Sequence, residues 1–342
     1  MAYRVGVVGA GFGGNVHVPA YKAHPAFELV AIASPNKAAQ IAREQEIPHA
    51  FASLDAMLDG VELDLVSVAS PPFDHHGAVK AALARGKNVL CEKPLATSVR
   101  LAREMLDLAA RAGTVCGVSH EFRFTASRHA IKELVDNGHL GALREIEITD
   151  FRTNLRAEMP SRPGWWFSKE RGGGLAQALT SHFIDNANWI AGRAPKLVAG
   201  TSRTANPARR TTGGETFATD VADGIFIVLD YGDGLVARIT TDATVAVASH
   251  VFAVHGERMT AVASGPTQLQ TQTFTVDGDE TNELGLRPSP YAKYAAVNPN
   301  VPLFLELLDE LAKALDGKPN SLPTFEEALA TQVVLEAIGY VV

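Results

Sequence analysis

The sequence predicts an α/β protein in two parts, a doubly wound parallel sheet followed by an α+β part with a mostly antiparallel sheet. Over the first 120 residues, short apolar runs alternate with helical stretches, which is typical of a parallel sheet with helices on both faces. From about residue 123, apolar and polar residues alternate within the runs, as in strands with one solvated face. The 342 residues are too many for one ordinary core. We therefore expect two domains, residues 1–122 and 123–342, with the C-terminal helix returning toward the first.

Five runs in the first part are almost entirely apolar, which is typical of strands that are buried on both faces. These predicted strands are Val5–Val8, Leu29–Ala33, Leu65–Ala69, Val89–Cys91 and Val115–Val118. The predicted helices between them are Asn15–Ala23, Lys37–Glu46, Ser53–Asp59, Asp74–Arg85 and Ser98–Arg111. Strands and helices that alternate at this spacing predict parallel pairing.

The second part opens with a predicted helix, Ser127–Asn137, which Gly138 closes. The predicted strands are Leu143–Thr153, Lys196–Thr204, Ile225–Tyr231, Leu235–Val245 and His250–His255. The Gly- and Asp-rich residues 230–234 predict a hairpin, and the stretch Thr201–Thr219 predicts a surface loop. A final helix is expected at Pro323–Tyr340, with Thr324 as its cap.

Composition and charge argue against several classes of function. The net charge of −7 speaks against a nucleic-acid or anionic-membrane partner, because both attract basic surfaces. No apolar run reaches the roughly 18–20 residues that span a bilayer, and the first residues do not resemble a signal peptide, so we expect a cytoplasmic protein. Two cysteines provide neither a disulfide framework nor a four-cysteine zinc site. The eleven histidines form no H-E-x-x-H pattern, so we expect no catalytic metal.

A glycine-rich loop follows the first predicted strand and opens the first predicted helix. It consists of Gly9, Ala10, Gly11, Phe12, Gly13 and Gly14, with the spacing G-x-G-x-x-G. We expect Gly9 to permit the tight turn, Gly11 to let the backbone approach a pyrophosphate, and Gly14 to allow close packing of helix on strand. The amides at the start of the helix would bind the diphosphate. This position predicts a dinucleotide site, and the alternative is a plain tight turn.

The end of the second predicted strand bears on the choice of dinucleotide. An acidic residue usually follows this strand and binds the ribose, but the chain continues as Ser34-Pro35-Asn36-Lys37. A carboxylate would repel a 2′-phosphate, whereas Ser34, Asn36 and Lys37 can accept one. The sequence therefore predicts a preference for NADP, with NAD as the alternative. In the other interpretation Ser34 only caps a helix.

At Cys91-Glu92-Lys93-Pro94 the chain resembles the Gfo/Idh/MocA family, the glucose–fructose oxidoreductase, inositol dehydrogenase and rhizopine-catabolism group. The resemblance covers essentially the whole chain. Its segments are Gly9–Gly14 with His17, Ser70-Pro71 with His75, Gly86–Val89, Glu92–Ala96, Gly138 with Gly141, Gly172–Gly174, Ser181-His182 and Asp185. It implies a Rossmann domain followed by a domain with a large open, mostly antiparallel sheet. That sheet commonly mediates oligomerisation, so we expect a homodimer or homotetramer.

Lys93 follows a predicted buried strand, at the carboxyl end where ligands bind in this architecture. A lysine there can hydrogen-bond a substrate hydroxyl and stabilise the alkoxide that develops as hydride leaves carbon. The resemblance places Lys93 at the junction of nicotinamide and substrate, and Glu92 on the nicotinamide side. The alternative is a solvated lysine at a strand end.

The glycines Gly172–Gly174 precede a predicted helix, Leu175–Ile190. A histidine can move a proton near neutral pH, and the resemblance makes His182 the acid/base for the substrate hydroxyl. Taken alone, a helix histidine more often packs or caps.

The chain departs from the family at two positions before His182. Ala178 stands where the common dehydrogenase pattern has Asp, and Thr180 stands where it has Gly. Gln177 is adjacent but about 100° round a regular helix from position 178, which makes it a poor substitute. Asp185, one turn after His182, is a second candidate for support. We therefore do not transfer inositol dehydrogenase activity.

Further candidates for the site are expected at strand ends and before the glycine run. Ser70, Pro71 and His75 should lie beside the cofactor ribose or nicotinamide. The cleft candidates are His120, Glu121 and Arg123, and the aromatic candidates for a sugar platform are Trp165, Trp166 and Phe167. His17 is expected to pack the first helix, and Arg152 and Arg156 to lie at a solvated strand edge.

These features predict an NADP(H)-dependent oxidoreductase that moves hydride between the nicotinamide and a secondary alcohol or ketone of a sugar, cyclitol or related polyol. The small molecule is thus the expected partner. Two other functions remain open at this point. One is a hydrolase that works by transient oxidation of a sugar, as in some relatives, and the other is a non-catalytic regulator that senses NADP.

Overall fold

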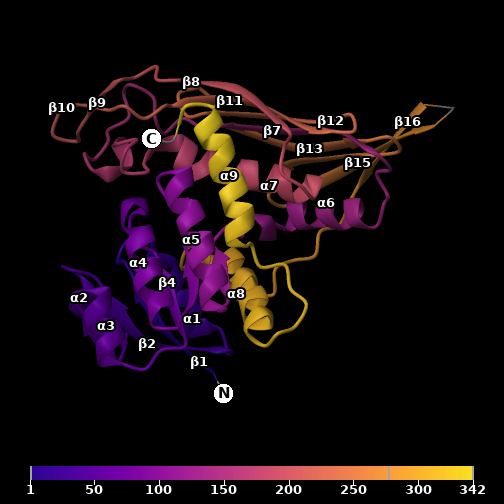
Figure 1. Cartoon of the computed structure of the whole chain (residues 1–342). Coiled ribbons are helices and arrows are strands. Elements are labelled where there is room, and N and C mark those ends of the chain that lie inside the picture. The colour runs from indigo at the N-terminus through magenta and orange to yellow at the C-terminus, as the bar shows by residue number, and fades with distance from the viewer. Residues whose placement is uncertain (1, 276–277, 341–342) are drawn as a thin grey trace. The chain divides into compact units, whose positions relative to one another are not determined.

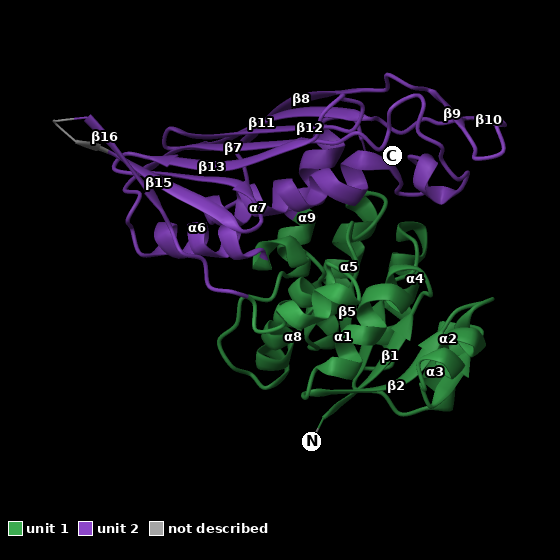
Figure 2. Cartoon of the chain, turned by 180° about the vertical axis from the view of Figure 1, so that it is seen from behind, with its two compact units in different colours: residues 1–124, 289–329 green, residues 125–288, 330–342 purple. Residues whose placement is uncertain are grey.

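The computed structural model describes residues 2–275 and 278–340 of the protein. It divides into two compact units, coloured separately in Figure 2. Unit 1 comprises residues 1–124 and 289–329, and unit 2 comprises residues 125–288 and 330–342. Each unit is built on one large β-sheet, parallel in unit 1 and mixed in unit 2.

The sheet of unit 1 has six parallel strands. They are β1 (Tyr3–Val8), β2 (Phe27–Ala33), β3 (His49–Phe51), β4 (Leu65–Val68), β5 (Asn88–Cys91) and β6 (Cys116–Val118), in the order β3-β2-β1-β4-β5-β6; Figure 1 labels β1, β2 and β4. The order changes direction between β1 and β4, and ligands bind outside the carboxyl ends of the strands at such a point. The five predicted strands are confirmed within two residues at each end. β3 was missed because its short segment is mostly exposed and carries no apolar run.

Helices cover both faces of this sheet. They are α1 (Val18–Ala23), α2 (Ala38–Glu44), α3 (Leu54–Gly60), α4 (Pro72–Ala84), α5 (Val99–Ala112) and α8 (Val301–Leu315). Val5 and Val7 of β1 belong to an apolar cluster with α1, α2 and α8. Val66 and Val68 of β4 belong to a second cluster with α3, α4 and α5. The strands are therefore buried on both sides, as the nearly continuous apolar runs predict.

Residues 289–329 belong to unit 1, whereas the predicted boundary at residue 122 assigns them to the second domain. The cause is α8, a helix that was not predicted. Its Phe304, Leu305 and Leu308 are fully buried in the cluster that also contains side chains of β1. Burial of such large apolar side chains fixes the segment to the first sheet, although it follows the second part in the chain.

The sheet of unit 2 has eight strands and is mostly antiparallel, as predicted. Its order is β16-β15-β14-β13-β7-β12-β11-β8, and among its described strands β7 and β12 pair in parallel while the other neighbours pair antiparallel. The strands are β7 (Leu143–Phe151), β8 (Leu197–Arg203), β11 (Gly224–Gly232), β12 (Leu235–Asp242), β13 (Ser249–Gly256), β14 (Thr260–Gly265), β15 (Gln268–Thr275) and β16 (Gly278–Glu283). The predicted hairpin joins β11 to β12 through three residues with positive φ, Gly232, Asp233 and Gly234.

One face of this sheet carries the helices of unit 2. α6 (Ala126–Asp136) packs on β14, and α7 (Ser181–Ala191) packs on β7 and β12, on the same side of the sheet in Figures 1 and 2. The last helix, α9 (Phe325–Ala337), runs from unit 1 into unit 2. The predicted cap of α9 is confirmed, because the Thr324 hydroxyl accepts from the Glu327 amide while the Glu327 carboxylate accepts from the Thr324 amide.

The predicted surface loop at residues 201–219 is wrong in part. Within it, β9 (Ala208–Arg210) and β10 (Thr216–Ala218) form an antiparallel hairpin. The side chain of Arg209 is only 1% exposed. The polar composition of this segment suggested a solvated loop. Composition does not reveal that Arg209 is buried and pairs with a carboxylate inside the protein.

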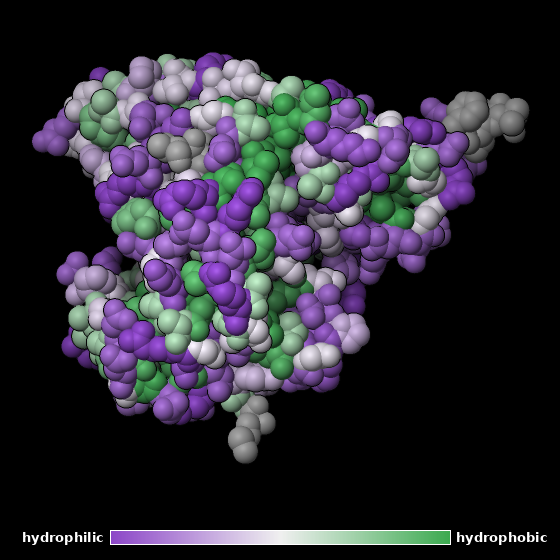
Figure 3. Space-filling model, viewed as in Figure 1, coloured by the Kyte–Doolittle hydropathy of each residue, from purple (hydrophilic) through white to green (hydrophobic). Residues whose placement is uncertain are grey.

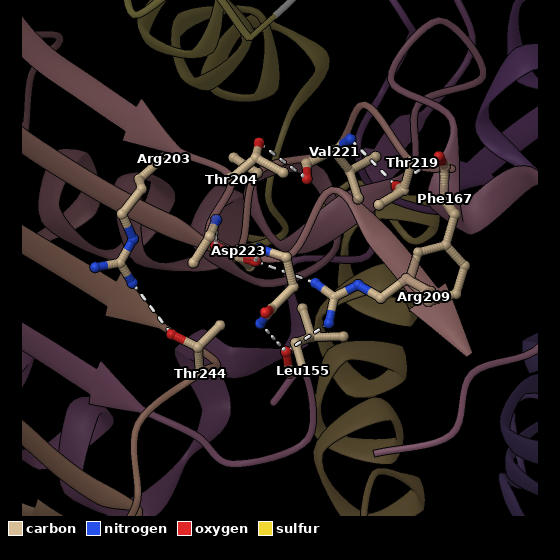
Figure 4. Close-up of polar contacts among 12 residues, drawn as sticks. Leu155, Phe167, Arg203, Thr204, Arg209, Thr219, Val221, Asp223 and Thr244 are labelled. Atoms are coloured by element: carbon tan, nitrogen blue, oxygen red, sulfur yellow. Dashed lines mark hydrogen bonds and ion pairs between the residues drawn. The ribbon is translucent and has the colours of Figure 1, made fainter. Parts of the chain in front are cut away.

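A buried ion pair holds this hairpin in unit 2 (Figure 4). Arg209 Nη2 donates to Asp223 Oδ2 at 3.1 Å, and Arg209 also donates to the carbonyl of Leu155. The Asp223 carboxylate in turn accepts from the amides of Ala205 and Asn206, at 2.8 and 3.0 Å. Asp223 is thus satisfied by one cation and two backbone donors, which offsets the cost of burying its charge.

The described residues contain neither a helix long and apolar enough to cross a membrane nor a cluster of three metal-ligating side chains. On the face in Figure 3, hydrophilic and hydrophobic residues are interspersed. Some large apolar side chains of unit 2 are nevertheless exposed, among them Leu197 at 56% and Val228 at 42% on neighbouring strands of the sheet.

We predict that Asp223→Asn destabilises the protein by about 3–5 kcal/mol, because it leaves the buried Arg209 cation without its partner. Chemical denaturation measures the loss. Asp233→Asn is the control, since Asp233 pairs with Arg193 but is 78% exposed, and it should cost less than about 1 kcal/mol. Equal losses for the two variants would contradict the role of the buried pair.

Candidate active site

The loop after β1 comes very close to the end of β4 at Gly9. Gly9 has a φ of +109°, and a Cβ there would lie 2.3 Å from the carbonyl oxygen of Ala69. No side chain fits this position. Gly11, two residues on, is exposed, and a Cβ built on it meets nothing within 4 Å. Its backbone therefore faces open space, as the approach of a pyrophosphate requires.

The first helix begins with a wide π-turn, Gly13–His17, in which the Val18 amide bonds to the Gly13 carbonyl. A Cβ on Gly13 would lie 3.0 Å from the Cβ of Ala69, so Gly13 is the residue that permits close packing of helix on strand. The sequence assigned this part to Gly14, whose added Cβ meets only the end of a side chain of α2. The wide turn explains the difference, because it changes which residue faces the sheet. Phe12 is half-buried, and its ring packs on that of His17.

No carboxylate lies between the end of β2 and α2. β2 ends at Ala33, Ser34 is half-buried, and Asn36 and Lys37 are exposed. Ser34 is not the helix cap that the alternative interpretation suggested, since α2 begins after Lys37 and has no side-chain cap. The segment therefore presents a hydroxyl, an amide and an ammonium group, and no carboxylate.

The end of β4 provides a hydroxyl and a buried imidazole. Ser70 Oγ is buried and has no hydrogen-bond partner in the part of the chain that the structure describes. His75 is fully buried, with Nε2 2.9 Å from the Ser70 carbonyl and Nδ1 3.0 Å from the Pro94 carbonyl. Burial lowers the pKa of His75 in spite of these bonds, so the neutral ring donates to one carbonyl at a time. Pro71, next to Ser70, precedes α4 in an extended conformation.

Glu92, directly after β5, is bound by a histidine of the glycine-loop helix. His17 Nε2 lies 3.0 Å from Glu92 Oε1, and His17 Nδ1 lies 2.8 Å from the hydroxyl of Ser67 in β4. Tyr21 also donates to that hydroxyl, at 3.1 Å. Burial alone would raise the pKa of Glu92, but the bond and charge of His17, with the charges of Lys93 and His75, outweigh it and lower the pKa. Glu92 is therefore a buried carboxylate at neutral pH.

Lys93 lies at the carboxyl end of β5 and is half-buried. Both of its neighbours are anchored, Glu92 by His17 and the Pro94 carbonyl by His75. The peptide between Lys93 and Pro94 is cis. The backbone that carries the ammonium group is thus held on both sides by buried imidazoles.

The residues after β6 are buried, and Arg123 among them bonds to the start of α9. His120, Glu121 and Arg123 are each 3% exposed or less. Arg123 Nη1 donates to Glu327 Oε1 at 2.9 Å, and Glu327 caps the start of α9. Within unit 1, Arg123 therefore fixes the start of α9. The sequence predicted Arg123 as a residue of the substrate cleft, and this structural contact was not predicted.

In unit 2, the glycine run before His182 is required by close contacts. A Cβ on Gly173 would lie 2.3 Å from the carbonyl oxygen of Trp166. A Cβ on Gly174, whose φ is +91°, would lie 2.3 Å from the hydroxyl of Tyr340 and 2.6 Å from Cβ of Val221. Backbone contacts therefore fix where the following helix begins.

That helix also begins with a π-turn, Ala176–Thr180, and continues as α7. The Ser181 amide bonds to the Ala176 carbonyl five residues back. The Thr180 hydroxyl lies 2.7 Å from that of Thr241 in β12, and both residues are fully buried. The predicted helix Leu175–Ile190 is thus confirmed, but its first turn is wider than a regular α-helix. His182 and Asp185 lie on α7 and are buried, at 1% and 0% exposure.

Trp165, Trp166 and Phe167 form a short 3₁₀ turn before the glycine run and are each half-buried. The Thr219 hydroxyl donates to the Phe167 carbonyl at 2.9 Å (Figure 4), and the Phe167 ring packs edge-on against Phe217. The segment is thus held by Phe217 of β10 and by Thr219, which directly follows that strand. Its fixed position is compatible both with packing and with the predicted sugar platform at Trp166.

Two family models match the chain. Residues 3–120 match the model described as an oxidoreductase family with an NAD-binding Rossmann fold, and residues 129–262 match the GFO/IDH/MocA C-terminal domain. The chain belongs to the Gfo/Idh/MocA oxidoreductase family. The resemblance seen in the sequence is confirmed, and so is the fold that it implies.

Among curated Gfo/Idh/MocA relatives, the chain is 28% identical to 1,5-anhydro-D-fructose reductase of Ensifer adhaerens over 75% of this chain and 74% of that protein. It is 34% identical to D-glucoside 3-dehydrogenase of Escherichia coli over 55% of this chain and 54% of that protein. The matched region thus spans about half the length of that relative. A solved levoglucosan dehydrogenase in complex with NADH has a TM-score of 0.88 at 22% identity, covering 99% of this chain and 96% of that one, which shows a shared fold.

His17 is the residue whose role the sequence did not reveal. We expected it to pack the first helix, and it does contact the ring of Phe304, with centroids 4.1 Å apart. Its bonds to Glu92 and Ser67 were not expected. The available signal was its position between apolar residues, Val16 and Val18, because a buried imidazole requires polar partners.

We predict that His17→Phe destabilises the protein at neutral pH by about 3–5 kcal/mol, because it removes the partner of a buried carboxylate. The folded-state pKa of Glu92 lies below its ordinary value of 4.5, so its stabilisation is present above that pH and is lost as pH falls through the folded-state value. The difference between wild type and variant should therefore narrow in acid.

Denaturant titrations from neutral pH to below the folded-state pKa of Glu92 test this expectation. Glu92→Gln is the matched variant, since it removes the charge and keeps a hydrogen-bond partner for His17, and it should cost less than His17→Phe. A difference between wild type and His17→Phe that stays constant with pH would show that only packing against Phe304 is lost.

Proposed function

We propose that the protein is an NADP(H)-dependent oxidoreductase that moves a hydride between the nicotinamide and a secondary alcohol or ketone of a sugar, cyclitol or related polyol. The observation that carries this proposal is the fixed position of Lys93 at the carboxyl end of β5, between two anchored neighbours. Parallel strands of this order bind ligands at that edge. The names of the relatives, a reductase of 1,5-anhydro-D-fructose and a dehydrogenase of D-glucosides, support the substrate class.

The residues of unit 1 fit a dinucleotide. Gly11 exposes its backbone, Gly9 admits no side chain, and the Ser70 hydroxyl has no partner among the described residues. When bound, the nicotinamide supplies a hydride acceptor or donor. We assign the diphosphate to the amides of Gly11–Gly14 together with Phe12, and the nicotinamide side to Ser70, Pro71, His75 and Glu92.

In the proposed oxidation, two side chains of this chain act on one substrate hydroxyl. Lys93 donates a hydrogen bond to the oxygen and stabilises its negative charge. His182 takes the proton of that hydroxyl, so the carbon loses a hydride and becomes a carbonyl carbon. In the reverse direction, His182 returns the proton to the oxygen. We further assign His120, Glu121, Arg123 and Trp166 to the substrate side.

The preference for NADP rests on the segment after β2. It presents Ser34, Asn36 and Lys37 and no carboxylate. A 2′-phosphate carries two negative charges at most and is attracted by Lys37, whereas the ribose hydroxyl of NAD lacks the acidic partner that usually binds it.

We predict that NADPH binds at least about tenfold more tightly than NADH, by fluorescence titration, and that Lys37→Glu removes most of this preference through charge repulsion. Lys80→Glu changes the net charge equally at an exposed position of α4 and should leave the ratio unchanged. Tighter binding of NADH by the wild type would overturn the proposed preference and leave NAD as the cofactor.

Turnover is tested with myo-inositol, levoglucosan and methyl glucoside with NADP⁺, and with 1,5-anhydro-D-fructose and NADPH. We predict that Lys93→Met lowers kcat about 100-fold or more with NADPH binding retained, because one donor to the developing oxyanion is lost. Lys87→Met, just before β5, is the control and should keep its activity. Unchanged turnover in Lys93→Met would refute the role of Lys93.

Two other outcomes would redirect the assignment. Cleavage of methyl glucoside with no net change in NADPH absorbance would favour a hydrolase that acts by transient oxidation. NADPH binding without turnover of any of the four compounds would favour a regulator that senses NADP. The Ala178 position, where the usual pattern has Asp, is the observation that keeps the regulator open.

We also propose that the chain forms a homodimer or homotetramer through the sheet of unit 2. The described helices of that unit pack on one face, and Val228, Arg238 and Phe226 alternate with buried side chains along the strands. Multi-angle light scattering measures the mass.

A cytoplasmic location is proposed as well, supported by the two free thiols, Cys91 and Cys116.

A further inference from the structure

The end of β7 in unit 2 carries an arginine that other side chains hold in place. Arg152 directly follows β7, and its Nε donates to Asp150 Oδ1 at 2.6 Å. His250 of β13 approaches the other oxygen of the same carboxylate, with Nδ1 3.1 Å from Asp150 Oδ2. The backbone amide of Arg152 donates to the Asp242 carbonyl of β12 at 2.7 Å. The backbone and the side chain of Arg152 are thus both fixed.

Asp150 is the buried anchor of this group, since its side chain is only 8% exposed. Burial alone would raise the pKa of Asp150, but the hydrogen bonds and charges of His250 and Arg152 outweigh it and lower the pKa. Asp150 is therefore a carboxylate at neutral pH. It shares its hydrogen bonds between two donors, so the guanidinium is not the only group that stabilises it.

The guanidinium of Arg152 has a second edge that Asp150 does not use. A guanidinium carries five N–H donors in a planar fork. Asp150 takes the edge formed by Nε and Nη2, with Nη2 3.4 Å from Oδ2, and Nη1 makes no hydrogen bond within the described residues. The side chain is 45% exposed. The edge formed by Nη1 and Nη2 is thus left with two parallel donors, the arrangement that binds a carboxylate through two hydrogen bonds.

Strand pairing places Asp150 next to the helix that carries His182. Asp150 of β7 is directly opposite Thr241 of the neighbouring strand, β12. The Thr241 hydroxyl lies 2.7 Å from that of Thr180, two residues before His182. Because paired residues of neighbouring strands point to the same face of a sheet, Asp150 lies on the face on which α7 packs.

His250 gives the same position from the other side of β7. It is directly opposite Asp150, and its ring centroid lies 5.9 Å from that of Phe183, which follows His182 in α7. Asp150 is thus flanked by two residues that contact the start of α7. The guanidinium of Arg152, which is bonded to Asp150, therefore lies beside the turn of α7 that carries His182.

We propose that Arg152 binds a carboxylate of the substrate, so that the substrate is a sugar acid such as a uronate. This inference rests on the proposed function, in which His182 exchanges the proton of the reacting hydroxyl. The carboxylate belongs to a carbon other than the one that loses the hydride, and Asp150 and His250 are positioning residues for the guanidinium. Hydrogen bonds between two charged groups are about twice as strong as those between neutral ones, which favours a sugar acid over the neutral sugar.

Binding of two sugars that differ only at C6 tests this without any turnover. Methyl glucuronide has a carboxylate where methyl glucoside has a hydroxymethyl group. Calorimetric titration of the full-length protein saturated with NADPH, which cannot accept a hydride, should give a Kd at least about tenfold lower for the glucuronide. Arg152→Leu should remove this difference. Arg152→Lys should keep part of it, since an ammonium group has the charge but not the planar fork.

Arg156→Leu is the matched control, because Arg156 lies in the same segment after β7, is 38% exposed and pairs with Glu158. It should keep the full difference. Asp150→Asn leaves the charge of Arg152 but weakens its anchor, and should reduce the difference about threefold. The proposal is overturned if the wild type binds the two sugars equally or does not bind the glucuronide, or if Arg152→Leu keeps the difference.

Turnover with NADP⁺ separates this inference from the proposed function. Arg152→Leu should raise KM for methyl glucuronide about tenfold and change kcat less than threefold, as expected for a group that binds the substrate away from the reacting carbon. Turnover of methyl glucoside with no advantage for the glucuronide would refute the sugar-acid class and leave the proposed function intact. Tight binding of the glucuronide without turnover of either sugar would refute the proposed function, while the Kd of Arg152→Leu would still decide the role of Arg152.

Discussion

The cofactor half of the protein depends on one buried contact, the hydrogen bond between His17 and Glu92. The two residues, together with Ser67, come from the segments of three neighbouring strands, β1, β4 and β5. Carboxyl ends of parallel strands meet at one edge, so loops that are distant in sequence must share that edge. The imidazole of His17 lies in the helix that follows β1, and it bonds both to Ser67 of β4 and to Glu92 after β5. It therefore fixes the relative position of the three segments. The loop that exposes Gly11 and the loop that carries Lys93 are thereby held as one rigid surface.

Both units use the same local device to position a histidine. In each, a run of glycines makes contacts that exclude a Cβ, a π-turn follows, and a buried histidine ends or follows the turn. Such a turn is less favourable than a regular helix, and it is retained where a side chain must point in a direction that a regular helix does not allow. In unit 1 the turn directs His17 at Glu92, and in unit 2 it changes the phase of the helix just before His182.

Much of the architecture could be predicted from local patterns, and what could not be predicted depends on distant contacts. Strands buried on both faces, such as β4, carry apolar runs that need no other information. α8 was missed although its apolar residues have helical spacing, and its place in unit 1 could not be read from the chain order. Arg209 was placed in a solvated loop because its partner, Asp223, lies elsewhere in the sequence. The glycine loop and Lys93 were found by motif, whereas the His17 bonds and the π-turns require coordinates.

The two departures from the usual family pattern have a common electrostatic sense. No carboxylate follows β2 in unit 1, where the dinucleotide ribose usually has an acidic partner. In unit 2, Ala178 stands where the family pattern has an Asp four residues before His182. Each unit therefore lacks one negative charge that the usual pattern has. For the proposed NADP, the missing carboxylate of unit 1 removes repulsion toward the 2′-phosphate, and Lys37 attracts it. In unit 2 the missing Asp removes the group that would stabilise an imidazolium, and a neutral amide, Gln177, is buried one residue earlier. The chain as a whole is acidic, with a net charge of −7. The absence of carboxylates at these two positions is therefore a local feature and does not reflect a shortage of acidic residues in the chain. Under the proposed function, a protein that keeps Lys93 and His182 while it lacks both carboxylates retains the two groups proposed to act on the substrate hydroxyl, and only the charges near them differ.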